Sequence, residues 1–113
     1  FDENEYILLL TLKAGEYTGS RVSDVDLFRI RNAMPHLAET LKKSLRPGDA
    51  VAQFSDSQYV ILLSACTYEG GMLAANRIIS KFYQDHKVYR NLKIKIHIEK
   101  VKTAEHILNK YSG

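Results

Sequence analysis

The chain has 113 residues, of which 45% are hydrophobic and 26% are charged, an ordinary composition for one globular domain with one modest core. No apolar run approaches the roughly 20 residues of a membrane-spanning helix, and the net charge of +3 is too small to indicate nucleic-acid binding by itself. The single cysteine, Cys66, cannot form an internal disulfide, so we expect a domain of the reducing cytoplasm. Because the first residue is Phe1 and not Met, we expect residues 1–113 to be one domain of a longer, multidomain protein.

The first half of the chain predicts a strand followed by a long helix. Residues 5–13, EYILLLTLK, form a short apolar run, which favours a buried strand. From Ser23 onward, apolar residues recur at the three- and four-residue steps of a helix face, namely Leu27, Ile30, Met34, Leu37, Leu41 and Leu45. Ser23 or Asp24 is a suitable N-cap. Pro35 removes a backbone donor inside this pattern and therefore predicts a kink or a short break near Arg31.

The second half predicts a hairpin, a second helix and a last strand. Residues 50–54, AVAQF, alternate, residues 58–64, QYVILLS, are almost continuously apolar, and the polar tripeptide SDS at 55–57 predicts a tight turn between these two strands. Thr67 can cap the following helix, whose expected apolar stripe is Met72, Ala75, Ile79 and Phe82. Residues 92–101 alternate strictly, which predicts a strand with one wet face. Its expected apolar face is Leu92, Ile94, Ile96 and Ile98, and its expected polar face is Lys93, Lys95, His97 and Glu99.

This order of elements predicts an α+β fold of the ferredoxin-like βαββαβ type, with an antiparallel sheet and both helices on one face. A further short helix is expected at residues 103–111, packed across one end of the domain. Because this architecture serves proteins with many functions, the function has to be inferred from particular residues.

The charge distribution and the histidines bear on two other functions, nucleic-acid binding and metal binding. From residue 76 onward nine Lys and Arg stand against three acids, so a basic face around Lys93, Lys95 and His97 leaves open a small nucleic-acid-binding domain. The four histidines, His36, His86, His97 and His106, show neither an i,i+4 pair nor an HExxH spacing. The sequence therefore predicts no metal site.

The run SLRPGDAVAQFSDSQYVILLSA, with AANRIISKF after it, resembles the GGDEF domain of the diguanylate cyclase family. That family has a helix ending in LRxxD, a strand, the Gly-Gly-Asp/Glu-Glu-Phe hairpin, and a later helix with an arginine. Here Arg46 and Asp49 hold the RxxD positions, and Arg77 holds the place of the later arginine. The hairpin motif falls on Ser55, Asp56, Ser57, Gln58 and Tyr59.

The departures from the family motif concern its chemistry. The paired glycines that let a nucleotide approach the hairpin are replaced by residues with side chains. The metal-binding carboxylates of the family are replaced by Ser57 and Gln58 on the hairpin and by Thr11 on the first strand, while the nearby Lys13 would repel Mg²⁺. Two-metal phosphoryl transfer depends on such carboxylates. We therefore expect no enzyme activity, no cofactor and no bound metal.

The resemblance favours a non-catalytic regulatory or interaction module of a bacterial signalling or transcription-regulatory protein. Degenerate hairpins of this kind resemble those of domains attached to transcriptional activators that carry a winged-helix DNA-binding domain. The expected partners are other domains of the same chain or a homodimer partner, without a membrane, and with nucleic acid bound only through a domain outside these residues.

The alternative is a cyclic di-GMP receptor, because the RxxD turn and the later arginine form an inhibitory cyclic di-GMP site in active members of the family. Arg46 and Arg77 can bind phosphate oxygens or stack on guanine, and Asp49 can accept from the guanine N–H edge. On this hypothesis the three residues should converge on one exposed concavity beside the hairpin, with both guanidinium groups pointing outward.

Overall fold

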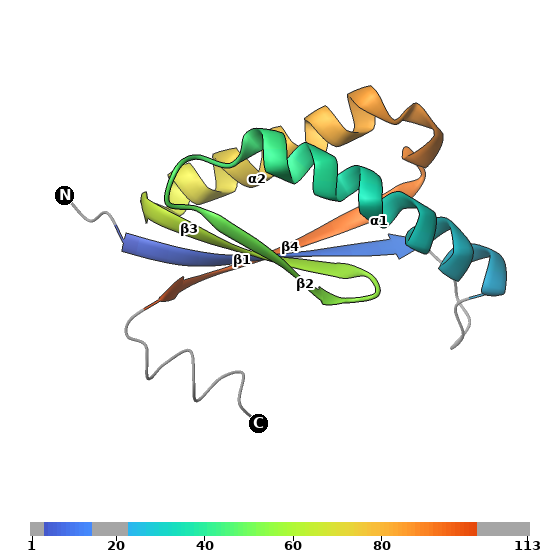
Figure 1. Ribbon diagram of the computed structural model, residues 1–113, viewed down its shortest axis with the longest axis horizontal. Coiled ribbons are helices and arrows are strands. Elements are labelled where there is room, and N and C mark those ends of the chain that lie inside the picture. The colour runs from blue at the N-terminus through green and yellow to red at the C-terminus, as the bar shows by residue number, and fades with distance from the viewer. Residues whose placement is uncertain (1–3, 15–22, 102–113) are drawn as a thin grey trace.

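The computed structural model describes residues 4–14 and 23–101, and in them the expected strands and helices are present in the expected order (Figure 1). In chain order the elements are β1 Asn4–Ala14, α1 Asp24–Ser44, β2 Ala50–Ser55, β3 Gln58–Cys66, α2 Tyr68–Asp85, a short 3₁₀ helix Lys87–Tyr89 and β4 Leu92–Val101. The helix expected at 103–111 lies outside the described residues. No helix within those two described ranges combines the length and the apolarity needed to span a membrane.

The strands form one four-stranded antiparallel sheet in the order β2-β3-β1-β4, and both helices lie on the same face of it, as predicted (Figure 1). In the central strand β1, Leu8 pairs with Ile61 of β3 and with Ile98 of β4. Because strand side chains alternate between the two faces, Leu8, Leu10 and Leu12 all point toward the helices, and each is at most 2% exposed. The core therefore lies between the sheet and the helices.

Helix α1 begins where the sequence predicts it. The Ser23 hydroxyl caps it by accepting a hydrogen bond from the backbone N–H of Asp26 at 3.1 Å. The expected break near Arg31 is wrong, since the helix continues without interruption through Pro35 to Ser44. Pro35 and Arg31 both lie on the exposed side of the helix, where water can bond the carbonyl that the proline leaves without a donor. The opposite side is buried on the sheet and holds the helix in place on both sides of the proline.

Helix α2 confirms the expected cap at Thr67 but corrects the expected apolar stripe. The buried residues of this helix are Gly71, Ala75, Ile78 and Phe82. Ile79 and Met72, which were expected in that stripe, are only partly buried. The shift arises because Gly71 lies at the contact with β4, where an added Cβ would come within 2.5 Å of the Ile98 side chain. A glycine there lets the helix approach the strand closely.

Candidate functional site

The residues that the resemblance assigns to the hairpin motif occupy the tip of the β2–β3 hairpin, as predicted, and we call this the turn end of the hairpin. The Ser55 hydroxyl donates to the Gln58 side-chain oxygen at 2.9 Å and accepts from the Ser57 backbone N–H at 3.3 Å. The side chain of Asp56 is 87% exposed and approaches Arg31 only at 4.0 Å. The turn end is thus a polar turn whose serine hydroxyl bonds within the turn itself.

The structure brings Thr11 and Gln58 together. The two residues oppose each other in the β1–β3 register, and the Gln58 amide donates to the Thr11 hydroxyl at 3.0 Å. The GGDEF resemblance assigns metal-binding carboxylates to both of these positions. In this chain the pair consists of a neutral amide and a neutral hydroxyl, which supply no anionic oxygen for Mg²⁺.

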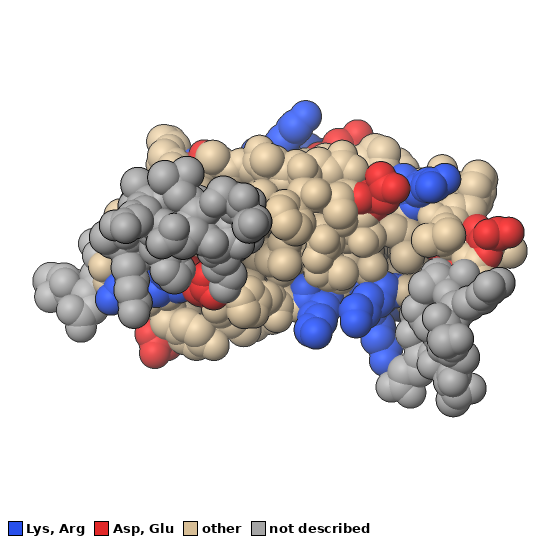
Figure 2. Space-filling view, turned by 90° about the horizontal axis from the view of Figure 1, so that it is seen from below, with Lys and Arg blue, Asp and Glu red and all other residues tan. Residues whose placement is uncertain are grey.

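A shallow hollow surrounds this pair on the sheet face that carries no described helix. Its volume is about 370 Å³, and its lining is Leu9, Thr11, Lys13, Gln58, Lys95 and His97. Figure 2 views the molecule from the side of this face, where Lys and Arg side chains gather along one edge. No carboxylate of the described residues lines the hollow. Its charge can attract an anion and repels a metal cation.

Tyr59, the last residue of the motif, has a packing role. Its side chain is on the helix side of β3 and the residue is 7% exposed. Its hydroxyl donates to the backbone carbonyl of Met34 in α1 at 2.8 Å, and burial raises the pKa of Tyr59. This residue therefore connects the hairpin to the helical layer.

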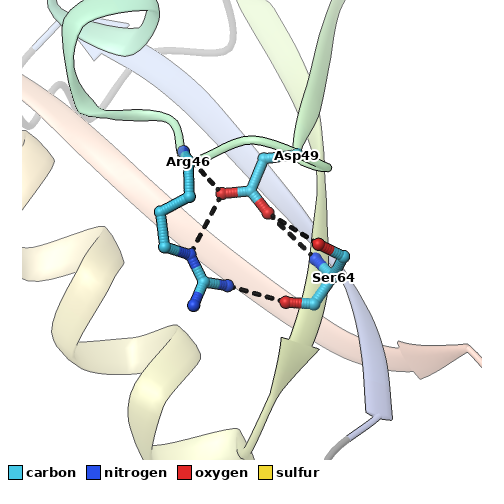
Figure 3. Close-up of polar contacts among 3 residues, drawn as sticks. All are labelled: Arg46, Asp49 and Ser64. Atoms are coloured by element: carbon cyan, nitrogen blue, oxygen red, sulfur yellow. Dashed lines mark hydrogen bonds and ion pairs between the residues drawn. The ribbon is translucent and has the colours of Figure 1, made fainter.

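Arg46 and Asp49 lie at the other end of the hairpin, which we call the open end (Figure 3). One Asp49 carboxylate oxygen accepts from the backbone N–H and the Nε of Arg46, at 3.0 and 3.4 Å. The other oxygen accepts from the backbone N–H and the hydroxyl of Ser64, at 3.0 and 3.3 Å. The Arg46 guanidinium also donates from Nη2 to the Ser64 carbonyl at 2.6 Å. These three residues form one closed polar network.

The network fixes the ionisation of Asp49. The Asp49 side chain is 2% exposed, and burial by itself would raise its pKa. The backbone hydrogen bonds from Ser64 and Arg46, together with the Arg46 guanidinium, outweigh burial and lower the pKa of Asp49 below its ordinary value. The carboxylate is therefore charged at neutral pH and bonded at both oxygens.

Local backbone geometry explains why Ser64 is available to this network. The β1–β3 register shifts between Asn4 and Tyr6, and Ala65 in the bulged part of β3 has a φ of 47°. Strand β2 begins only at Ala50, which pairs with Leu62, so the Ser64 backbone extends past the paired part of β2. The Asp49 and Arg46 side chains bond the Ser64 backbone N–H and C=O in place of a further strand residue.

Gly48 makes the turn before Asp49 possible. It has a φ of 94°, a region that favours glycine, and a Cβ there would meet the Ser64 hydroxyl at 2.8 Å. The RPGD turn is closed by a hydrogen bond from the Asp49 backbone N–H to the Arg46 carbonyl at 3.0 Å. Gly48 and this main-chain hydrogen bond therefore place the Asp49 side chain beside Ser64.

Arg46, Asp49 and Arg77 line one cavity of about 150 Å³ between the RPGD turn and α2. Their convergence agrees with the receptor hypothesis, but one detail differs from it. The cavity lies beside the open end of the hairpin, and the Arg46 guanidinium, which was expected to point outward, is bonded to Asp49 and to Ser64. Arg77 is exposed, and within the described residues the structure records neither a hydrogen bond nor an ion pair for it.

Sequence reasoning missed Ser64, although it completes the network. Ser64 contributes mainly through its backbone N–H and C=O. Nearly every residue type has these groups, so the sequence does not indicate which residue uses them. Lys13 and Lys95 were each noted in the sequence, but their proximity follows only from the β1–β4 register, in which Thr11 pairs with Lys95.

Two solved structures with similar folds give the comparison with known proteins. One is a DGC (diguanylate cyclase) protein from Thermotoga maritima, with a TM-score of 0.58 and 15% identity over 96% of this chain and 75% of that one. The other is PelD 156-455 from Pseudomonas aeruginosa PA14 in complex with c-di-GMP, with a TM-score of 0.55 and 13% identity over 98% of this chain and 38% of that one. No protein-family model and no curated protein matches the sequence. At these identities the comparison establishes the fold, which is GGDEF-like, as the resemblance in the sequence implied.

Proposed function

We propose that this chain is a non-catalytic GGDEF-like regulatory module of a bacterial signalling or transcription-regulatory protein. The observation that carries the proposal is the hydrogen-bonded pair of Thr11 and Gln58, which stands where the resemblance places metal-binding carboxylates. Phosphoryl transfer is accelerated mainly by metal ions and charged groups that neutralise the developing charge. A neutral pair beside Lys13 and Lys95 provides no site for those ions.

A module without catalysis acts through the surfaces that it presents to other domains or to a second copy. The motif residue Tyr59 and the open-end network both stabilise the fold, which agrees with a scaffold that is retained for its shape. The similarity of this fold to that of a diguanylate cyclase protein and of PelD supports a role in signal transduction.

The direct test is incubation of the purified chain with GTP and Mg²⁺, followed by chromatography and mass spectrometry of the nucleotides. We expect no dinucleotide above the level of a buffer blank. Formation of cyclic di-GMP that depends on the wild-type chain would overturn the proposal.

A matched variant tests the physical reason. The triple substitution Thr11→Asp, Ser57→Asp and Gln58→Glu places carboxylates where the resemblance requires them. We expect Mg²⁺ to raise the melting temperature of this variant and to leave that of the wild type unchanged. An equal Mg²⁺ effect on both proteins would mean that carboxylates at these three positions do not decide metal binding, which would contradict the stated reason.

The second candidate function is a cyclic di-GMP receptor, favoured by the convergence of Arg46, Asp49 and Arg77 on one cavity. PelD, one of the structural neighbours, was solved in complex with c-di-GMP. Arg46 is a poor probe of this function, because its bonds to Asp49 and Ser64 make its removal a change in stability as well. Arg77 is the better probe, since it is exposed and lines the same cavity.

Calorimetry with cyclic di-GMP tests this candidate. If the cavity is the receptor site, Arg77→Ala should weaken binding about tenfold or more, because a charge-assisted contact contributes roughly 1.5–3 kcal/mol. Arg90→Ala is the control, as Arg90 is exposed and does not line the cavity. Absence of heat with the wild type at high micromolar ligand would eliminate the receptor function and leave the regulatory module unaffected.

A further inference from the structure

The helical layer contains a cluster of metal-binding side chains that neither the motif nor the cavity at the open end includes. His36 and Glu39 project from α1, and His86 follows the last residue of α2. One donor atom from each of the three side chains lies within 4.8 Å of the other two. The imidazole rings of His36 and His86 have centroids 4.6 Å apart. Two imidazoles and one carboxylate thus meet where the two helices pack together.

The cluster is held by well-fixed elements. His36 and Glu39 are three residues apart in the same helix, a spacing that places both side chains on one side of it. The His86 backbone N–H donates to the Phe82 carbonyl at 2.9 Å, and the His86 ring packs against the Phe82 ring with centroids 5.5 Å apart. Phe82 belongs to the buried core, so the position of His86 is determined by packing.

One nitrogen of His36 lacks a hydrogen-bond partner among the described residues. The Nδ1 atom of His36 is buried and forms no hydrogen bond with any of the described residues. Buried polar side-chain atoms are nearly always bonded, and an unbonded one opposes folding. A metal ion held at Nδ1 would give this nitrogen the partner that the described protein atoms do not provide.

The donor set selects the class of metal. Two imidazole nitrogens with one carboxylate are ligands of Zn²⁺ and of related first-row transition metals, whereas Mg²⁺ and Ca²⁺ prefer oxygen ligands. We propose that His36, Glu39 and His86 form a transition-metal site, with Zn²⁺ as its best-fitting ion and the fourth position open to water. The ion would join α1 to the end of α2 and so stabilise the packing of the helical layer.

The geometry allows an ion to enter and bind. Donor atoms around one Zn²⁺ lie roughly 3.3 Å apart, given Zn–N distances of about 2.0–2.1 Å, so these side chains must move closer together. Glu39 is exposed and can rotate toward the histidines. Glu39 and His86 also line a cavity of about 330 Å³ that reaches the surface between the helices. Three cations, Lys43, Arg77 and Lys81, line that cavity too. The Lys81 ammonium group lies 3.6 Å from the Asp85 carboxylate, which offsets its charge, and the Glu39 carboxylate lines the same cavity.

Zinc titration of the metal-free chain tests the site. We expect calorimetry to show one Zn²⁺ bound per chain, with a higher melting temperature in its presence and no such change with Mg²⁺. Co²⁺ should produce visible absorption bands of a low-coordinate site. A wild-type chain that binds no Zn²⁺ at high micromolar concentration would overturn the proposal.

Variants distinguish this site from other zinc-binding groups on the surface. Glu39→Gln keeps the shape of an exposed side chain and should weaken Zn²⁺ binding about tenfold, while His86→Ala should weaken it about a hundredfold. His97→Ala, on the opposite face of the sheet, should bind Zn²⁺ as the wild type does. If Glu39→Gln and His86→Ala both keep wild-type affinity while His97→Ala loses it, the metal binds elsewhere and the proposal is wrong.

Discussion

The two ends of the β2–β3 hairpin hold their polar residues in different ways. At the turn end, the Ser55 hydroxyl donates to Gln58, the Gln58 amide donates to Thr11, and Asp56 is almost fully exposed. At the open end, the Asp49 carboxylate is buried. It accepts hydrogen bonds from the backbone N–H groups of Arg46 and Ser64, and Ser64 lies past the part of β3 that pairs with β2. Removing Asp49 therefore leaves the backbone N–H groups of Arg46 and Ser64 without their acceptor, whereas removing Asp56 breaks only an exposed contact at 4.0 Å.

This difference explains which motif residues the chain retains. The RxxD positions keep Arg46 and Asp49 because the turn and the end of β3 need them, whether or not a ligand binds. At the turn end the hairpin forms with the neutral side chains of Ser57 and Gln58, so its fold does not depend on carboxylates there. Retention of a motif residue is thus weak support for a ligand site when the residue also completes a closed hydrogen-bond network within the fold.

The largest expected effect is that of Asp49→Ala. This change removes the acceptor of four hydrogen bonds and leaves the partly buried Ser64 backbone N–H without that acceptor. We expect the free energy of unfolding to fall by about 3 kcal/mol in urea denaturation. Asp56→Ala is the control at the turn end and should change it by at most about 0.5 kcal/mol. Equal losses of unfolding free energy for Asp49→Ala and Asp56→Ala would show that the two ends of the hairpin do not differ in their importance for stability.

The same carboxylate predicts a pH dependence at the open end. Because the pKa of Asp49 is lowered in the folded state, its charged form stabilises the fold above the unfolded pKa, and this contribution is lost as the pH falls through the folded pKa. The difference in stability between the wild type and Asp49→Asn should therefore be constant near neutral pH and should narrow below about pH 4. Urea denaturation at several pH values measures this difference in stability. A difference that widened on acidification would contradict the conclusion that folding lowers the pKa of Asp49.

A smaller loss is expected for Gly48→Ala. Alanine at a φ of 94° is strained, and its Cβ would also lie 2.8 Å from the Ser64 hydroxyl, so we expect a loss of about 1–2 kcal/mol. Ala65→Gly is the matched comparison, because Ala65 already has a positive φ of 47° and glycine relieves it. Thermal unfolding of both variants should show a lower melting temperature for Gly48→Ala and no comparable decrease for Ala65→Gly.

The sequence was sufficient for most of the fold, because alternation and helical periodicity both reflect which side of an element is buried. The β4 alternation and the caps at Ser23 and Thr67 were predicted correctly for this reason. The break expected at Pro35 and the placement of Ile79 in the α2 stripe were wrong. Both errors concern tertiary packing, which holds α1 together across a proline and rotates α2 around its contact at Gly71.

The candidate sites were only partly predictable. The family resemblance implied that Arg46, Asp49 and Arg77 would converge, and they line one cavity. The involvement of the Ser64 backbone depends on a bulge in β3, and no sequence motif predicts that bulge. The cluster of His36 and His86 joins the middle of one helix to the end of the other, so rules of local spacing could not find it.

The smallest expected effect is that of Tyr59→Phe, which tests the connection between the hairpin and α1. The Tyr59 hydroxyl donates to the Met34 carbonyl at 2.8 Å in a buried position. Met34 lies within α1, where its carbonyl also accepts from the helix, so losing the tyrosine leaves no carbonyl without a partner. Phenylalanine keeps the ring that fills the core, and it is the residue that the GGDEF motif has at this position. We expect the free energy of unfolding to fall by about 1 kcal/mol, measured by urea denaturation. A loss as large as that of Asp49→Ala would show that the hairpin depends on its contact with α1 as strongly as on its open end.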